Sequence, residues 1–329
     1  MTKKRYRILS LDGGGIRGII TAVWLHALEE KLDDHSPGRK LCDVFDLIAG
    51  TSTGAILACA VASGTPAEKI IELYEGQGGS IFPRPRFWLL NDLRIALRTV
   101  LGMPLYSPRA LEESLKDQFG PDTKFNFATD VLVTSYDTLN RNPVIFKSWR
   151  PKYQNAAVWE VCRASSAAPT YFPAHTMLLN DAEIPLVDGG VVANNPSVCG
   201  IAEGLKIQAD PARTTDACGL KDFIVASFGT GSSTKPITIH QAVHWGPIKW
   251  LFPVIDVIFD GSQDASNYIA SKLISKANYF RFQTLLDHHY EDMDKTDAVN
   301  LNALKAFADD YVYSSEVEDE MNTLVKMLV

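Results

Sequence analysis

Short apolar runs alternate along the chain with longer segments whose apolar residues recur at helical spacing. The uninterrupted runs at residues 6–11 and 223–228 have the length of strands that are buried on both faces. In residues 19–32, by contrast, Val23, Ala27 and their apolar neighbours fall on one face of a helix. We therefore predict an α/β protein, in which strands form a central sheet between helices.

The second half of the chain contains antiparallel as well as parallel patterns. Two pairs of strands are joined by short turns, and the C-terminal residues are typical of two amphipathic helices. The predicted elements in this half are, in chain order, strands at 130–136 and 143–149, a helix at 156–165, strands at 175–179 and 184–187, a helix at 262–276 and a strand at 279–285. We therefore expect two pairs of turn-joined strands in this half of the chain.

The composition is that of a globular protein. The chain has 329 residues, of which 46% are hydrophobic and 22% are charged, so it can bury a sizeable core. It shows no internal repeat, low-complexity tract or clear linker. We therefore predict a single domain over residues 1–329, with a core at about 5–285 and a C-terminal helical segment at 286–329.

The net charge and the cysteine content indicate which class of partner and which cellular compartment to expect. A net charge of -7 argues against nucleic acid as the main partner. The five cysteines are scattered without a Cys-x-x-Cys pair, which favours reduced core residues in a reducing compartment. The basic N-terminus lacks the apolar run of a signal peptide, and no stretch of about 18 apolar residues could span a membrane. We expect a cytoplasmic protein with no metal and no cofactor.

The most specific local signal lies at residues 50–54. A short apolar strand ends at Gly50-Thr51-Ser52-Thr53-Gly54, and a helix of small apolar residues follows. Gly-x-Ser-x-Gly between a strand and a helix is typical of a nucleophile elbow with Ser52 at its tip. Gly50 and Gly54 would avoid side chains that collide with the adjacent strand and helix. The alternative is an ordinary N-cap serine in a glycine-rich turn.

A glycine cluster from Gly13 to Gly18 follows the first predicted strand. Gly13-x-Gly15-x-x-Gly18 satisfies the dinucleotide-binding fingerprint, in which backbone N–H groups cradle a phosphate. The alternative is an oxyanion hole, where glycines let N–H groups approach a reacting oxygen. The dinucleotide fold also requires a second strand that ends in an acid about 20 residues on, but residues 33–38 are a helix end and a loop. We therefore favour the oxyanion hole.

Asp188 is a third candidate, at the end of another predicted strand. Gly189 and Gly190 follow it and would let a second backbone come very close. An aspartate in an ordinary turn is the commoner alternative. Functional groups of α/β sheets collect at the carboxyl ends of parallel strands, and all three candidates follow predicted strands. A common site is therefore expected.

Taken together, the three motifs resemble the patatin-like phospholipase family. They occur in the order Asp-Gly-Gly-Gly-x-Arg-Gly at 12–18, Gly-x-Ser-x-Gly at 50–54 and Asp-Gly-Gly at 188–190. The segment from Ser166 to Pro173 is also similar, and the resemblance covers roughly residues 5–275. It implies a three-layer α/β/α sandwich with a mostly parallel central sheet. It also implies a lipid acyl hydrolase that cleaves ester bonds of glycerophospholipids, lysophospholipids or galactolipids.

The resemblance further implies a role for each site residue. The nucleophile would be Ser52 and the base Asp188, with Gly50, Thr53 and Gly54 in the elbow, Gly189 and Gly190 supporting the aspartate, and Gly13, Gly14, Gly15, Arg17 and Gly18 in the oxyanion loop. Serine is a poor nucleophile until a base takes its proton. Burial can raise the pKa of a carboxylate, which makes it a better base for this purpose.

Two other functions remain open from the sequence. An α/β-hydrolase triad would use Ser52, Asp188 and a later histidine, and the available histidines are His240, His244, His288 and His289. None of the four lies in a small-residue turn after a clear strand. A nucleotide-binding protein would instead use the Gly13–Gly18 loop for phosphate, and Ser52 would be structural.

Hydrolysis of a long-chain lipid requires contact with a bilayer or micelle. Two stretches combine large apolar and basic side chains, as interfacial anchors do. They are Phe87-Trp88-Leu89-Leu90, flanked by Arg84, Arg86, Arg94 and Arg98, and Trp245 to Phe259 with Lys249. We expect peripheral membrane contact through one or both, the alternative being that they pack on the core.

Overall fold

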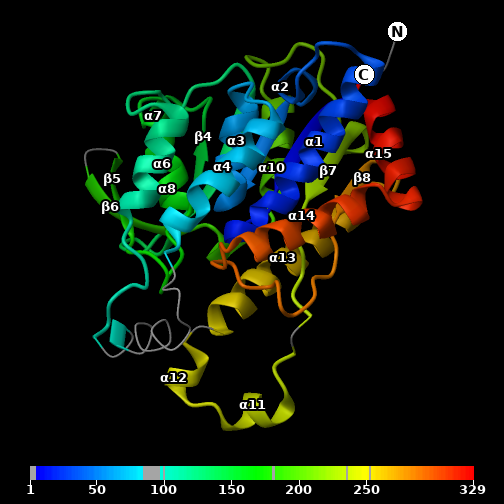
Figure 1. The fold of residues 1–329 in the computed structure, drawn as a ribbon. Coiled ribbons are helices and arrows are strands. Elements are labelled where there is room, and N and C mark those ends of the chain that lie inside the picture. The colour runs from blue at the N-terminus through cyan, green and yellow to red at the C-terminus, as the bar shows by residue number, and fades with distance from the viewer. Residues whose placement is uncertain (1–4, 84–96, 99–100, 180–181, 235, 252) are drawn as a thin grey trace.

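The computed structural model describes residues 5–83, 97–98, 101–179, 182–234, 236–251 and 253–329 (Figure 1). Within these residues an eight-stranded sheet has the order β5-β6-β3-β2-β1-β7-β8, and β4 pairs with β3 outside this order. The strands are β1 (Tyr6–Leu11), β2 (Leu47–Thr51), β3 (Asp130–Asp137), β4 (Asn142–Lys147), β5 (His175–Leu179), β6 (Ala182–Asp188), β7 (Phe223–Phe228) and β8 (Tyr279–Phe282).

Five of these strands, β3, β2, β1, β7 and β8, are parallel and form the centre of the sheet. β4, β5 and β6 pair antiparallel. The continuous apolar runs of β2 and β7 are buried at every residue, as expected for strands covered on both faces. The mostly parallel sheet is therefore confirmed, and β1 and β7 have the bounds that the sequence predicts.

Helices make up most of the remaining regular structure. Their bounds are η1 (Gly15–Arg17), α1 (Gly18–His35), α2 (Leu41–Val44), α3 (Thr53–Ala62), α4 (Ala67–Ile81), α6 (Arg109–Phe119), α7 (Pro151–Gln154), α8 (Val158–Ser165), α9 (Gly190–Ala193), α10 (Ser197–Gln208), η2 (Leu220–Asp222), α11 (Ile239–His244), α12 (Pro247–Trp250), α13 (Pro253–Leu273), α14 (Ala298–Val312) and α15 (Ser315–Leu328). The sequence predicts a helix only from residue 262, whereas α13 begins at Pro253. A proline is well tolerated in the first turn of a helix.

The helices cover both faces of the sheet. Leu9 and Ile48 point to one face, in a hydrophobic cluster with residues of α1, α3, α4 and α8. Ile8 and Leu47 point to the other face, where they join residues of α10 and α13. Successive strand residues therefore enter different clusters, as the two-residue period of a strand requires. The three-layer α/β/α sandwich is confirmed.

The two C-terminal helices pack on α1 rather than standing apart from the sheet domain (Figure 1). Leu304 of α14 and Leu324 of α15 are fully buried and belong to the same cluster as Leu9. The indole N–H of Trp24 in α1 also donates to the carbonyl oxygen of Ala308, at 3.0 Å. Residues 286–329 thus share their hydrophobic core with the first strand and helix.

Two strands meet end to end along one edge of β3. β2 pairs with the first part of β3, where Thr51 lies opposite Thr134. β6 approaches from the opposite direction and pairs with the next residues, where Asp188 lies opposite Ser135. Because β4 occupies the other edge of β3, the last residues of β2 and β6 must face each other. This arrangement brings two distant parts of the sequence to one place.

The helices α11 and α12 lie at the end of the molecule opposite the two chain termini (Figure 1). The predicted anchor from Trp245 to Phe259 contains α12 and the start of α13. The other predicted anchor, Phe87 to Leu90 with Arg84, Arg86 and Arg94, lies outside the described residues. None of the helices that the structure describes is both long enough and apolar enough to cross a membrane.

Candidate active site

Ser52 lies at a sharp turn between β2 and α3. Its backbone has φ 55° and ψ −123°, which is a strained conformation for a residue with a side chain. A Cβ atom on Gly50 would collide with the carbonyl of Gly54, and one on Gly54 would collide with the carbonyl of Leu11. The two glycines therefore allow β1, β2 and α3 to approach closely enough to form the turn.

The hydroxyl of Ser52 donates a hydrogen bond to Asp188. The Ser52 Oγ to Asp188 Oδ2 distance is 2.7 Å, and the other carboxylate oxygen accepts from the N–H of Gly190, also at 2.7 Å. Asp188 is fully buried, and Ser52 is 7% exposed. Burial raises the pKa of Asp188 from 3.8 to about 7, although both hydrogen bonds oppose this shift. The aspartate is thus a stronger base than an exposed carboxylate.

The end of α8 holds both members of this pair in place. Ser165 accepts a hydrogen bond from the N–H of Ser52 through its Oγ, at 2.8 Å. The N–H of Asp188 donates to the carbonyl of Ala167, at 3.0 Å. Sequence reasoning missed Ser165, and the only available signal was its position beside the Ser166–Pro173 segment.

The carbonyl groups of the glycine loop are held by specific donors. The carbonyl oxygen of Gly13 accepts from Thr230 Oγ1 at 2.9 Å and from Asn194 Nδ2 at 3.4 Å. The carbonyl oxygen of Gly14 accepts from the backbone N–H of Arg17 at 3.2 Å and from its Nε at 3.4 Å. In a planar trans peptide the N–H points away from the C=O. The N–H groups of Gly14 and Gly15 therefore point in the opposite direction.

Not every N–H of the loop is available for a ligand. Gly13 donates to the carbonyl of Asn194 at 3.0 Å, and Ile16 donates to the carbonyl of Met293 at 2.9 Å. Among the described residues, no acceptor is found for Gly14 or Gly15, and Gly15 lines the same pocket as Ser52. Of the three glycines Gly13, Gly14 and Gly15, only Gly14 and Gly15 therefore have a backbone N–H that is available to an oxyanion.

The support of the loop comes from far away in the sequence. Asp12 is fully buried and forms an ion pair with Arg281 of β8, with 2.6 Å between Oδ2 and Nη2. A Cβ atom on Gly18 would collide with the hydroxyl of Tyr74, which is hydrogen-bonded to Thr53. Sequence reasoning missed Arg281, Thr230 and the contact of Asn194. The only signal for Thr230 was its place after the buried strand, in Gly229-Thr230-Gly231.

An apolar pocket opens in front of Ser52 and Asp188. Its walls come from α3, α4 and α6 and from the segment that follows α8. The apolar lining includes Ile56, Leu73, Ile81, Leu111, Leu115 and Phe172. Such a surface can accept a hydrocarbon chain and exclude water from the serine.

Histidines do not take part in this site. All seven lie among the described residues, and none of them lines the pocket or hydrogen-bonds to Ser52 or Asp188. His240 and His244 are exposed on α11, with their rings stacked on each other. The geometry therefore does not support a Ser-Asp-His triad.

A phosphate loop is also disfavoured, because the N–H groups of Gly13, Ile16 and Arg17 are already bonded.

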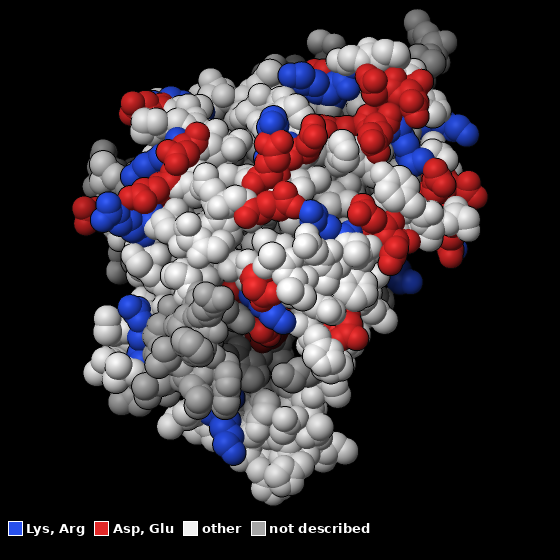
Figure 2. Space-filling model, viewed as in Figure 1, with Lys and Arg blue, Asp and Glu red and all other residues white. Residues whose placement is uncertain are grey.

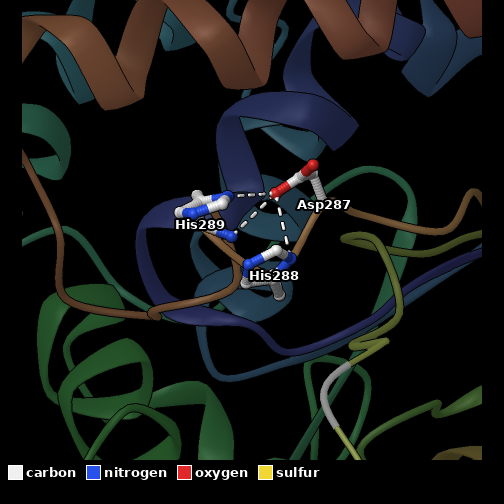
Figure 3. Close-up of side chains that lie close together, drawn as sticks. All are labelled: Asp287, His288 and His289. Atoms are coloured by element: carbon white, nitrogen blue, oxygen red, sulfur yellow. Dashed lines mark hydrogen bonds and ion pairs between the residues drawn. The ribbon is translucent and has the colours of Figure 1, made fainter.

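His288 and His289 belong to a separate surface cluster with Asp287 (Figure 3). Asp287 Oδ1 lies 2.7 Å from His289 Nδ1 and 3.4 Å from His288 Nδ1, and it also accepts from the N–H of His289. All three residues are exposed and follow one another in a turn. They are the only described residues that bring three typical metal-ligand atoms within 4.8 Å. The aspartate already binds both imidazoles, and the cluster does not line the serine pocket.

A serine on a nucleophile elbow, paired with an aspartate at a neighbouring strand end, places the molecule among α/β proteins with a candidate Ser-Asp dyad. A family model described as patatin-like phospholipase matches residues 9–197. Patatin-like protein 2 of Oryza sativa subsp. indica is 34% identical, over 85% of this chain and 76% of that protein. The chain belongs to the patatin-like phospholipase family.

Two further proteins are similar to this chain. Probable inactive patatin-3-Kuras 1 of Solanum tuberosum is 30% identical, over 96% of this chain and 88% of that protein. Among solved structures, VipD from Legionella pneumophila is similar with a TM-score of 0.46 and 12% identity, covering 98% of this chain and 66% of that one.

Proposed function

We propose that this protein is an acyl hydrolase that cleaves ester bonds of glycerolipids, with Ser52 as the nucleophile and Asp188 as the base. The observation that carries the proposal is the 2.7 Å hydrogen bond from Ser52 Oγ to the buried Asp188, at the end of an apolar pocket. An acyl chain in that pocket would bring its ester carbonyl to the serine. Membership of the patatin-like phospholipase family supports a lipid substrate.

The proposed reaction has two halves. Ser52 Oγ attacks the ester carbonyl carbon while its proton passes to Asp188, and the N–H groups of Gly14 and Gly15 stabilise the negative oxygen. Asp188 then gives the proton to the departing alcohol, which leaves an acyl group on Ser52. In the second half, Asp188 takes a proton from water as the water attacks the acyl group. The fatty acid departs and the proton returns to Ser52.

A direct test is incubation of the protein with a mixed lipid extract, followed by mass spectrometry of the released fatty acids. We expect free fatty acids and the matching lysolipids or deacylated headgroups to accumulate with wild-type protein and not with Ser52→Ala. Absence of any released fatty acid, together with stabilisation by a nucleotide, would reject the proposal in favour of nucleotide binding.

The pH dependence of hydrolysis should follow the ionisation of Asp188. A base must be deprotonated to accept the serine proton, and its pKa of about 7 lies well above the ordinary value of 3.8. We expect kcat/KM for a soluble short-chain ester to rise about tenfold per pH unit below about pH 6 and to level off above about pH 8. Thermal unfolding at each pH serves as the control for folding. A rate that is unchanged over this range would contradict the assignment.

We further propose that the surface formed by α11, α12 and the start of α13 contacts the lipid surface. Ile239 and Ile248 are 86% and 81% exposed, and Val243, Val254 and Val257 extend the same apolar surface. On the face shown, this end of the molecule carries few charged side chains among the described residues (Figure 2). Exposed aliphatic residues beside a basic residue such as Lys249 are typical of peripheral membrane contact.

Replacing Ile239 and Ile248 by glutamate should separate membrane contact from catalysis. We expect binding to phosphatidylcholine vesicles and hydrolysis of long-chain lipid to fall by about tenfold or more, because buried apolar area is replaced by charge. Hydrolysis of a soluble short-chain ester should remain unchanged. Val329→Glu is the matched control, since Val329 is also exposed but lies at the opposite end of the molecule. Equal loss on both substrates would indicate a structural role instead.

A further inference from the structure

A second cavity adjoins the serine pocket. Tyr171, Phe259 and Met293 line both spaces, so the two are neighbours. The second cavity has a volume of about 400 Å³, against about 90 Å³ for the serine pocket. An ester bound at Ser52 has an acyl side and an alcohol side. If the apolar pocket holds the acyl chain, the adjoining cavity is available for the alcohol side, which in a glycerolipid carries the headgroup.

Arg17 contributes a buried positive charge to this second cavity. Its side chain is 7% exposed, and its Nε donates to the carbonyl of Gly14 at 3.4 Å. Among the described residues, its terminal nitrogens have no hydrogen-bond or ion-pair partner, although it lines the cavity. Burial lowers the pKa of Arg17, whereas Asp260 and Asp256 raise it. A buried guanidinium without a direct partner points to a ligand that carries a negative group.

In the described part of the lining, acidic residues nevertheless outnumber this cation. Asp256 and Asp260 lie one turn apart on α13, and both line the cavity, together with Glu291 and Asp292. Counted over the described residues of the lining alone, four ionised acids and one guanidinium give a net charge of about −3. Burial and the neighbouring acids raise the pKa of Asp256 to about 6, so it still ionises near neutral pH. A purely anionic ligand would therefore be repelled.

Two of the acids are available to a ligand. Glu291 is bound to Ser233 and Thr234, whereas neither Asp256 nor Asp260 forms a hydrogen bond or ion pair with any described residue. The cavity acids do not bring three oxygens within 4.8 Å of one another among the described residues, so they do not form a metal cage. Trp245 adds an aromatic ring to the lining, a surface to which alkylammonium groups bind well.

Building on the proposed acyl hydrolase function, we propose that this cavity binds a zwitterionic phospholipid or lysophospholipid headgroup, and that Asp256 and Asp260 recognise its ammonium group. The negative phosphate of the same headgroup lies on the side of Arg17. Headgroups that lack an ammonium group, such as phosphoglycerol or a neutral sugar, leave both aspartates without a partner. The protein therefore favours choline and ethanolamine lipids over these.

The test compares lysophosphatidylcholine with lysophosphatidylglycerol of the same acyl chain, in neutral detergent micelles. We expect wild-type protein to prefer the choline lipid by about tenfold or more in kcat/KM, and Asp256→Asn/Asp260→Asn to lose this preference mainly through KM. Asp264→Asn is the matched control, because Asp264 is an exposed acid on α13 that does not line the cavity. Equal rates on both lipids in wild type, or an undiminished preference in the double variant, would overturn the inference.

A binding measurement separates this inference from the proposed catalysis. Ser52→Ala protein is titrated by calorimetry at low salt with glycerophosphocholine and, separately, with glycerol 3-phosphate. We expect only glycerophosphocholine to bind, and the two aspartate substitutions to remove its binding. Such binding without hydrolysis of any ester would count against the acyl hydrolase but not against the headgroup site. Hydrolysis without either headgroup preference or glycerophosphocholine binding would refute the headgroup site alone.

Discussion

Ser52→Ala and Asp188→Asn are each expected to lower kcat/KM for ester hydrolysis by at least about a thousandfold. In the proposed reaction, Ser52→Ala removes the atom that attacks the carbonyl. Asp188→Asn keeps the size of the side chain but removes the carboxylate that we propose accepts the serine proton, at 2.7 Å from Ser52 Oγ. Because the two groups act as one unit, kcat/KM of the double variant should be no lower than that of the less active single variant. The measurement is steady-state hydrolysis of a soluble short-chain ester.

Ser166→Ala provides the matched control for this experiment. Ser166 lines the same pocket and is almost fully buried, but its Oγ has no hydrogen-bond partner in the described part of the chain. Its loss should change the rate by much less than the loss of Ser52. Asp188→Asn should unfold at or above the wild-type temperature near pH 8, since it removes an ionised group from a fully buried site. Substantial activity in folded Asp188→Asn would show that another group is the base.

The second large effect is expected at the glycine loop. A Cβ atom on Gly14 would collide with the side chain of Thr230, so Gly14→Ala must move the loop or the threonine. The N–H groups of Gly14 and Gly15 would then no longer point to the oxyanion. We expect kcat to fall by about a hundredfold or more with KM nearly unchanged, because the oxyanion forms only on the way to the transition state.

Gly76→Ala is the control for the glycine substitution itself. Gly76 lies in α4, and a Cβ atom there would meet no other atom within 4 Å. This variant should keep full activity. If Gly14→Ala also keeps its kcat while remaining folded, the glycine loop does not hold the oxyanion. The N–H groups at the start of α3, beginning with Thr53, would then be the remaining donors beside Ser52.

Local sequence patterns were enough to predict the parts of the site that depend on neighbouring residues. The apolar run that ends in Gly-x-Ser-x-Gly specifies the elbow, because the turn requires glycines two residues before and after the serine. In the same way, the run that ends at Leu11 specifies β1 and the start of the glycine loop. Residues that are close together in the sequence determine these elements, so a local pattern is enough to predict them.

Contacts between distant residues could not be predicted in this way. Thr230 reaches the carbonyl of Gly13 across 217 residues, and Arg281 reaches Asp12 across 269. The hydrogen bond from the Gly13 N–H to the carbonyl of Asn194 likewise depends on where the fold places the segment between α9 and α10. The start of α13 at Pro253 was missed for a related reason, since the apolar residues there face partly outward and resemble a surface anchor. Each of these features is decided by packing rather than by local pattern.

Because β2 and β6 meet end to end on β3, the register of the sheet sets the distance between Ser52 and Asp188. Ser52 follows the residue opposite Thr134, and Asp188 lies opposite Ser135, so adjacent positions of one strand set the separation of the two side chains. A slip of β6 by one residue would turn Asp188 to the other face, and a slip by two would move it about 7 Å. Either shift exceeds the tolerance of a hydrogen bond. An insertion within β6 would therefore separate Ser52 from Asp188 and also turn buried residues such as Leu186 to the other face.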